Sequence, residues 1–363
     1  MLPLGFRSGK CRDVNSTQQL RHDMRLALCC VPAILIIFGI GLATQHLREA
    51  SVMASGALPL AFGASKTWEG SSAKLLLATL LSLGLCAFFG ALTGSLLLFI
   101  SGSMLFAAGY AVISGINGTA GWVVQQSAIA WMISGYFPGD ISHAASRAGL
   151  VMLGGTVQLM LICLLVRSGD FRLQSLTRFT WRSAVRRLKH ASRPKIHLRW
   201  SVVFAIIAMG TALLTVHHFS LQNGYWTGMT LLLCLRSHFR ESLLRVPART
   251  LGTLSGCLAA GILSHNVHQP ALLAAAFILS AYIAFTLSYR LANGSYFVFT
   301  FFVTLMVVLM ISLTGLVQGN VAEDRLLATA IGSGFALAAI LLTRLAAAMQ
   351  AKLSGKADFE TLY

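Results

Sequence analysis

The residues best suited to chemistry are four arginines in a short polar segment between two apolar runs. The segment separates the apolar residues at about 224–236 from those at about 250–264, and its arginines are Arg236, Arg240, Arg245 and Arg249. A guanidinium group binds a carboxylate through two parallel hydrogen bonds, so such a cluster can form the mouth of an anion path. Arginines also collect in cytoplasmic loops for reasons of membrane topology alone. Arg249 is the more specific candidate, because it stands at the foot of a glycine-rich apolar run.

Residues on either side of this cluster extend the candidate site. Tyr225 and Trp226 are either anchors at the membrane interface or rings that stack on an aromatic cargo. Gly252 and Gly256 have the small-xxx-small spacing that allows two helices to pack closely, and a pathway lined by backbone is the alternative.

Two further arginines lie where membrane topology does not account for them. Arg147 and Arg325 each begin an apolar run and each follow an acidic residue, Asp140 and Asp324 respectively. Each arginine therefore either pairs with that acid or faces a pore. None of the 11 acidic residues falls in the middle of a predicted span, so Asp140 and Asp324 at the span edges are the candidates for proton coupling.

The elements that must position these residues are membrane helices. Of the 363 residues, 56% are hydrophobic and 11% are charged, whereas soluble proteins carry about 25% charged residues. The formal net charge of +17 does not indicate nucleic acid, because the basic residues lie between apolar runs. With a cytoplasmic N-terminus, only Arg48, Arg147 and Arg325 of the 28 basic residues fall on the far side of the membrane. Both termini are therefore expected in the cytoplasm.

Twelve apolar runs divide into two sets of six that resemble each other. Arg147 precedes Gly154 by seven residues, and Arg325 precedes Gly332 by the same spacing. A shared offset between the two halves indicates a duplication, and an even number of spans in each unit makes the repeats parallel. We predict an all-α integral membrane protein of about twelve transmembrane helices, arranged as two parallel six-helix repeats.

The segmentation also sets the expected organisation of the chain. Its predicted parts are a cytoplasmic N-terminal lead (1–25), a first six-span repeat (26–166), a basic cytoplasmic linker (167–200), a second six-span repeat (201–345) and a cytoplasmic tail (346–363). The linker carries ten basic residues against the single acid Asp170. It is either an amphipathic helix on anionic lipid headgroups or a solvated connection.

Motifs of enzyme chemistry are missing from the sequence. The seven cysteines have no metal-ligand spacing, and the chain has no phosphate-binding loop, no His-Glu-x-x-His motif and no nucleophile elbow. We therefore expect a protein that is not an enzyme and that holds neither a metal nor a cofactor.

Several of these motifs together resemble the fusaric acid resistance (FUSC) family. The similar residues are Gly224-Tyr225-Trp226, the Arg-x-x-Gly-Thr-x-x-Gly run from Arg249 to Gly256, and the final-span motif from Asp324 to Gly332. The resemblance covers about residues 220–345 and implies a multi-pass exporter of aromatic acids in the bacterial cell inner membrane, with proton drive as one option. Many relatives carry cytoplasmic domains where this chain has only its linker and tail, so a homo-oligomer or an accessory export component is a further expected partner.

The expected function is efflux of small organic anions, aromatic carboxylic acids foremost. The candidates for substrate binding are Arg249 and Arg325, followed by Arg236, Arg245, Arg147, Tyr225 and Trp226. Anionic lipid headgroups at 167–200 are the second expected partner, and nucleic acid is not expected. A passive organic-anion channel and a non-transporting membrane scaffold with a lipid-binding linker are the alternatives.

Overall fold

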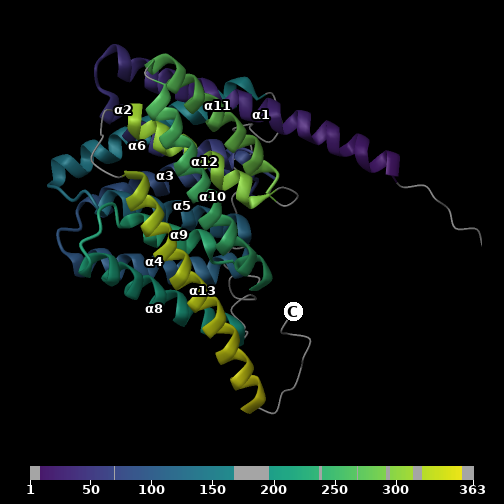
Figure 1. Cartoon of the computed structure of the whole chain (residues 1–363), viewed down its shortest axis with the longest axis vertical. Coiled ribbons are helices and arrows are strands. Elements are labelled where there is room, and N and C mark those ends of the chain that lie inside the picture. Colours follow the sequence, from purple (N-terminus) through teal and green to yellow (C-terminus); the bar gives the residue numbers. More distant parts are fainter. Residues whose placement is uncertain are drawn as a thin grey trace, which may run out of the picture.

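The predicted all-helical fold class is confirmed. The computed structural model describes residues 9–68, 70–166, 196–236, 239–267, 269–291, 295–313 and 321–353. In this part of the chain there are twelve α-helices and no strand (Figure 1). Most of the predicted basic linker (167–195) and the end of the predicted tail (354–363) lie outside the described residues.

Among the described residues, six helices precede the linker and six follow it. The first set is α1 (Gly9–Ala43), α2 (Leu47–Gly63), α3 (Ser72–Ala91), α4 (Leu96–Ile116), α5 (Gly118–Gly135) and α6 (Ile141–Leu165). The second set is α8 (Ile196–His218), α9 (Tyr225–Cys234), α10 (Phe239–Asn266), α11 (Pro270–Tyr289), α12 (Tyr296–Leu313) and α13 (Val321–Leu353).

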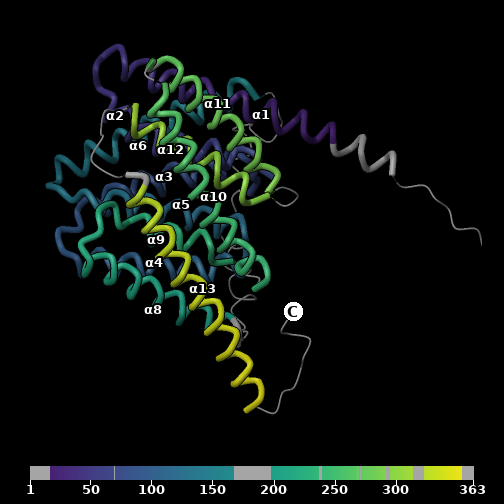
Figure 2. The backbone as a smooth tube through the Cα atoms, viewed as in Figure 1, coloured from purple at the N-terminus to yellow at the C-terminus, as the bar shows by residue number. Residues whose placement is uncertain are grey.

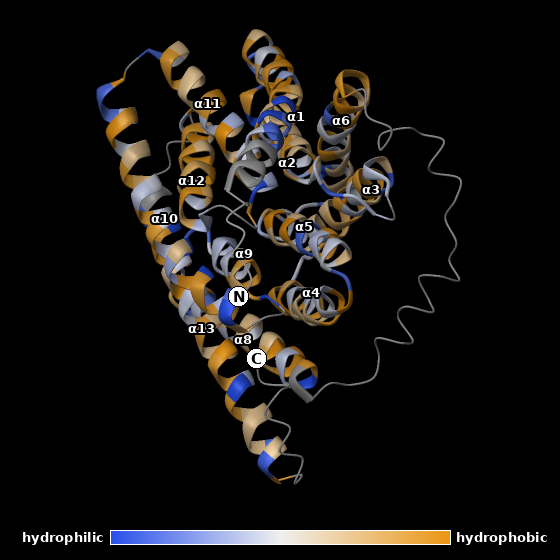
Figure 3. Ribbon diagram, turned by 90° about the vertical axis from the view of Figure 1, so that its right-hand side faces the viewer, coloured by the Kyte–Doolittle hydropathy of each residue, from blue (hydrophilic) through white to orange (hydrophobic). Residues whose placement is uncertain are grey.

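The chain is a multi-pass membrane protein. Nine helices within the described residues are long and apolar enough to cross a membrane, and α2, α5 and α9 fall outside that set. Large apolar side chains such as Leu97 and Leu105 are exposed, at 77% and 74%. Hydrophobic residues colour much of the length of the helices in Figure 3. A soluble protein rarely exposes apolar surface on this scale, whereas lipid tails solvate it without penalty.

Helix α9 is the short element of the second set. Its ten residues span about 15 Å at 1.5 Å per residue, which is half of the roughly 30 Å hydrocarbon layer. The sequence had already indicated a short apolar run at this position. By contrast α10 and α13, with 28 and 33 residues, extend beyond the predicted apolar spans into polar sequence.

Helices of the two halves interleave in the bundle. Helix α1 packs against α11, and α4 packs against α8 (Figure 2). One hydrophobic core joins α1, α2, α3 and α6 to α10, α11 and α12, while a second core joins α8, α9 and α13 to α4 and α5. Neither half buries its apolar surface alone, so the short helix α9 is enclosed by elements from both halves.

Candidate anion-binding site

The short helix α9 is the scaffold of the candidate site. Nine of its ten residues are buried, and the chain turns to an extended conformation at Leu235. The carbonyl groups at this end accept hydrogen bonds from the first half of the chain. The Gln125 side-chain Nε2 donates to the Leu232 carbonyl at 2.9 Å, and the Tyr110 hydroxyl donates to the Leu235 carbonyl at 3.0 Å. A helix can end inside a membrane protein only when its terminal carbonyl groups are paired in this way.

Arg325 on α13 approaches the start of α9. Its side chain is 1% exposed and is the largest fully buried side chain among the described residues. The guanidinium carbon Cζ lies 4.0 Å from the centre of the Trp226 ring, and Nη1 has no hydrogen-bond partner within the described part of the chain. A buried charge is costly unless an opposite charge and hydrogen bonds compensate for it. The stacking on Trp226 supplies only part of that compensation.

Arg249 on α10 is the second buried cation of the site. Its side chain is 3% exposed, and its Nε has no hydrogen-bond partner among the described residues. Arg249 is close enough to Arg325 for their positive charges to repel each other. The ion pairs formed within the described ranges do not include either arginine. The two guanidinium groups thus form a buried positive site that lacks a counter-charge within the described part of the chain.

Buried threonine hydroxyls lie on α9 and α10, which pack against α13, and on α12, which packs against α10. Thr227 and Thr230 on α9, Thr253 on α10 and Thr304 on α12 are buried, and their hydroxyls have no partner in the described part of the chain. Each hydroxyl is a hydrogen-bond donor that an anion could accept from.

Glycines bring these helices close together. A Cβ on Gly332 of α13 would collide with the carbonyl of Thr227 on α9, and one on Gly256 of α10 would lie 2.8 Å from the Thr304 Cβ on α12. Gly252 of α10 makes the corresponding approach to α12, where a Cβ would lie 2.8 Å from the Phe297 carbonyl oxygen. The threonines therefore stand at the contacts between helices.

A second group of charges stands at the end of α9, and we call it the connector cluster: Lys66, Arg236, Glu241 and Arg245. Glu241 Oε1 lies 2.9 Å from Arg245 Nη2 and 3.9 Å from Arg236 Nε. Lys66 comes from the loop between α2 and α3, and its Nζ lies 5.8 Å from the centre of the Trp122 ring. Burial lowers the pKa of Lys66, and the charges of Arg236 and Arg245 lower it further.

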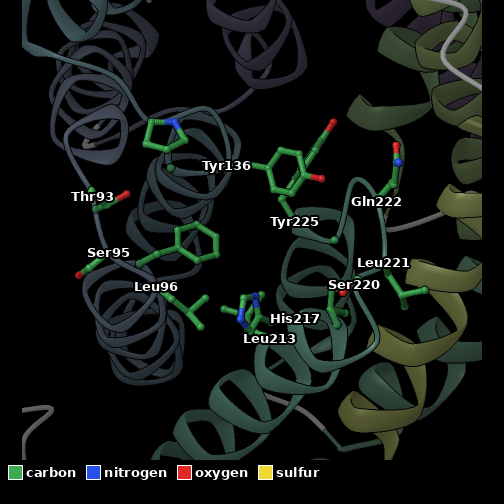
Figure 4. Close-up of a pocket in the computed structure, with 16 residues that line it drawn as sticks. Thr93, Ser95, Leu96, Tyr136, Leu213, His217, Ser220, Leu221, Gln222 and Tyr225 are labelled. Atoms are coloured by element: carbon green, nitrogen blue, oxygen red, sulfur yellow. The ribbon is translucent and has the colours of Figure 1, made fainter.

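A pocket of about 560 Å³ opens at the other end of α9, where α4 and α9 begin and α5 and α8 end (Figure 4). Tyr136 and Tyr225 lie on its wall with ring centres 5.0 Å apart, and His217 and Ser95 also line it. The Tyr225 ring lies 5.0 Å from that of Trp226. Tyr225 on the pocket wall therefore lies next to the ring that covers Arg325, and the pocket volume suits a small organic molecule.

The predicted substrate-binding residues fall into three groups along α9. Arg249, Arg325, Trp226 and Tyr225 form the central group, and Arg236 and Arg245 lie at the connector. Arg147 lies beside the end of α5: its Nε donates to Ser134 Oγ at 3.1 Å, and its Cζ lies 5.1 Å from the Phe137 ring. Arg240 is exposed, and His238 lies outside the described residues.

Neither Arg147 nor Arg325 forms an ion pair with its neighbouring acid within the described ranges. Asp140 instead caps α6, and its Oδ1 accepts the backbone N–H of His143 at 2.8 Å. The Asp324 Oδ2 accepts a long hydrogen bond of 3.5 Å from the Asn223 side chain. The sequence left two alternatives for each arginine, an ion pair with the nearby acid or a position facing a pore. Without the ion pair, the position facing a pore is the alternative that remains for both.

The sequence interpretation overlooked the uncharged polar members of the site. Lys66, which is charged, was also not singled out, and neither were Gln125 or the threonines. An amide side chain inside an apolar run was the sequence signal that could have identified such residues, because a polar side chain in a membrane span needs a partner. Gln158 on α6 is a further example: it is fully buried and both side-chain polar atoms lack a partner among the described residues.

The part of the chain that carries both central arginines is similar to a known protein family. Residues 197–339 match the family described as "Fusaric acid resistance protein-like". The match supports membership of that family. The match contains α9 to α12, most of α13 and both central arginines, and it confirms the resemblance seen in the sequence. No curated protein and no solved structure shows significant similarity to the chain. The match to the fusaric acid resistance protein-like family supports a membrane transporter.

Proposed function

We propose that the protein exports small organic anions, and aromatic carboxylates in particular, along the path marked by Arg249 and Arg325. The observation that carries the proposal is the pair of neighbouring buried guanidinium groups with no carboxylate paired to either one within the described ranges. A cargo carboxylate would supply the missing negative charge and accept hydrogen bonds from the free Nη1 and Nε atoms.

The aromatic preference follows from the residues next to Arg325. A planar ring attached to the carboxylate would meet the indole of Trp226 and the phenol of Tyr225, and rings of this kind pair favourably in offset or edge-to-face geometry. The family name refers to resistance to fusaric acid, which is itself an aromatic carboxylic acid. This chemistry supports an aromatic acid exporter. The distribution of basic residues supports a location in the bacterial inner membrane with both termini in the cytoplasm.

The architecture that we propose is two parallel six-helix repeats. Matched packing supports it: α3 packs on α5 and α6 as α10 packs on α12 and α13, and α2 packs on α6 as α9 packs on α13. In such a protein the cargo site lies between the repeats near the middle of the membrane. Helix α9 ends inside the bundle, as discontinuous helices do at transporter sites.

A passive anion channel is the second candidate, and the setting of Asp140 favours it over proton-driven transport through that residue. The backbone N–H of His143 and the hydroxyl of Ser142 lower the pKa of Asp140, because both hydrogen bonds favour the ionised carboxylate. A group that stays ionised near neutral pH does not exchange protons during transport. A carrier without such a group would move the anion down its electrochemical gradient.

Proteoliposomes loaded with benzoate test the proposal. The expected result is benzoate efflux that exceeds that of protein-free vesicles, and its response to a pH gradient at clamped membrane potential separates proton coupling from passive flow. Efflux that ignores the pH gradient would support the channel. A protein that moves neither benzoate nor fusaric acid would refute the transport proposal and favour a scaffold.

A further inference from the structure

The connector cluster contains its own carboxylate. Glu241 and Arg245 are one helical turn apart on α10, and Glu241 Oε1 lies 3.1 Å from Arg245 Nε and 2.9 Å from Arg245 Nη2. The same oxygen lies 3.9 Å from Arg236 Nε. Glu241 thus contacts the guanidinium of Arg245 much as the carboxylate of a bound organic acid would.

Positive charge in this cluster exceeds the negative charge. Lys66, Arg236 and Arg245 face the single acid Glu241. Arg245 Nη1 and Arg236 Nε are buried without a hydrogen-bond partner among the described residues, and so is the hydroxyl of Tyr296. A cargo carboxylate could accept hydrogen bonds from these donors.

An aromatic ring also stands beside Arg245. Its guanidinium Cζ lies 4.3 Å from the centre of the Tyr296 ring, and at the other end of α9 the Arg325 Cζ lies 4.0 Å from the Trp226 ring. The same combination of guanidinium and ring therefore occurs twice along the path. The two sites differ in that, among the described residues, only the connector site has a carboxylate of its own.

Exposure indicates which partner of the ion pair can leave. The side chain of Glu241 is 44% exposed, whereas that of Arg245 is 11% exposed. Rotation of the glutamate into water would leave the arginine in place with its hydrogen-bonding face free.

We propose that Glu241 acts as a built-in competitor that occupies the connector cluster until the carboxylate of a cargo displaces it from Arg245 and Arg236. This inference rests on the proposed transport function and adds a first binding site to it. A cargo anion arriving at the connector would replace Glu241, stack its ring near Tyr296, and then pass to Arg249. When the site is empty, Glu241 returns to Arg245 and neutralises part of the cluster.

Binding of benzoate and acetate to the purified full-length protein, measured by isothermal titration calorimetry, tests the inference. In Glu241→Gln the dissociation constant for both anions should fall about tenfold, the order expected when a charge-assisted competitor is removed. Glu49→Gln is the matched control: it removes one exposed acid from the first turn of α2 and should leave binding unchanged. In the double variant Glu241→Gln/Arg245→Gln the gain should disappear.

The measurement with acetate makes the test of Glu241 independent of which anion the protein transports. Tighter acetate binding by Glu241→Gln in a protein that does not transport benzoate would support the inference and reject the proposed cargo. Equal dissociation constants for the parent and Glu241→Gln would overturn the inference, whatever the flux assay gives. Thermal unfolding of each variant shows that it is folded, and Glu241→Asp, which keeps the charge on a shorter side chain, should bind with intermediate affinity.

Discussion

The guanidinium of Arg325 lies 4.0 Å from the centre of the Trp226 ring, and the arginine is 1% exposed. These residues are 99 positions apart in the sequence and belong to α13 and α9. The ring covers one face of the cation, and Nη1 has no hydrogen-bond partner within the described residues. An aromatic carboxylate has the two features that suit this arrangement, a charge for the arginine and a ring for the indole.

Trp226 should set the preference for aromatic cargo. Benzoate and cyclohexanecarboxylate carry the same charge on rings of similar size, but only benzoate has a π system. We expect Trp226→Leu to reduce the preference for benzoate by about 3- to 10-fold, because aromatic pairs are worth roughly 0.5–1.5 kcal/mol beyond buried area. The ratio of initial efflux rates measures this. A ratio equal to that of the parent would show that the indole does not contact the cargo.

Gly332 should matter for the packing of α13 on α9. A Cβ there would collide with the Thr227 carbonyl, whereas nothing lies within 4 Å of a Cβ at Gly334 on the same helix. Gly332→Ala should destabilise the protein by about 1–3 kcal/mol through overpacking. Gly334→Ala should be neutral or slightly stabilising, because alanine favours helix by about 1 kcal/mol over glycine.

Thermal unfolding in detergent compares these two variants under identical conditions. The account requires a lower melting temperature for Gly332→Ala than for Gly334→Ala. Equal melting temperatures would mean that α9 and α13 separate easily at this contact.

Asp140 should not control the pH dependence of transport. Its hydrogen bonds lower its pKa in the folded protein, so its stabilising effect is present above the unfolded value of about 3.9 and is lost as the pH falls through the folded value. The carboxylate therefore stays ionised between about pH 5 and 8.

Replacement of Asp140 by asparagine keeps a favourable N-cap on α6 without the charge. We expect Asp140→Asn to give the same profile of benzoate efflux against pH as the parent. Asp140→Ala should lower the melting temperature without changing that profile. A flattened profile in Asp140→Asn would instead identify this residue as the proton carrier.

Part of the fold could be predicted from hydropathy and charge. The all-helical class and the shortness of α9 follow from the lengths of apolar runs. Helix α10 begins at Phe239 and continues through Pro247, although its first turns are polar. Hydropathy marks the lipid-embedded part of a helix and not its hydrogen-bonded ends. The packing of α1 against α11 and of α4 against α8 could not be predicted from the order and lengths of the apolar runs.

The candidate site could be predicted only in its residue types. The glycine-rich run pointed to Arg249, and the position of Arg325 on the side poor in basic residues pointed to that residue. Their closeness depends on the packing of α10 and α13, which residue spacing does not encode. Lys66 joins the connector cluster from the first half of the chain, so no local pattern in the second half could have identified it.

Benzoate efflux from proteoliposomes carrying Arg249→Gln, compared with the parent and with Arg240→Gln, tests the central claim most directly. Both substitutions remove one positive charge from α10, but Arg249 is buried and Arg240 is exposed. We expect the initial rate to fall by about 100-fold in Arg249→Gln, since loss of a buried charged partner costs roughly 2–5 kcal/mol of binding. The exposed control should stay within about twofold of the parent. A folded Arg249→Gln protein that exports benzoate at the parent rate would contradict the claim that this buried arginine binds the cargo.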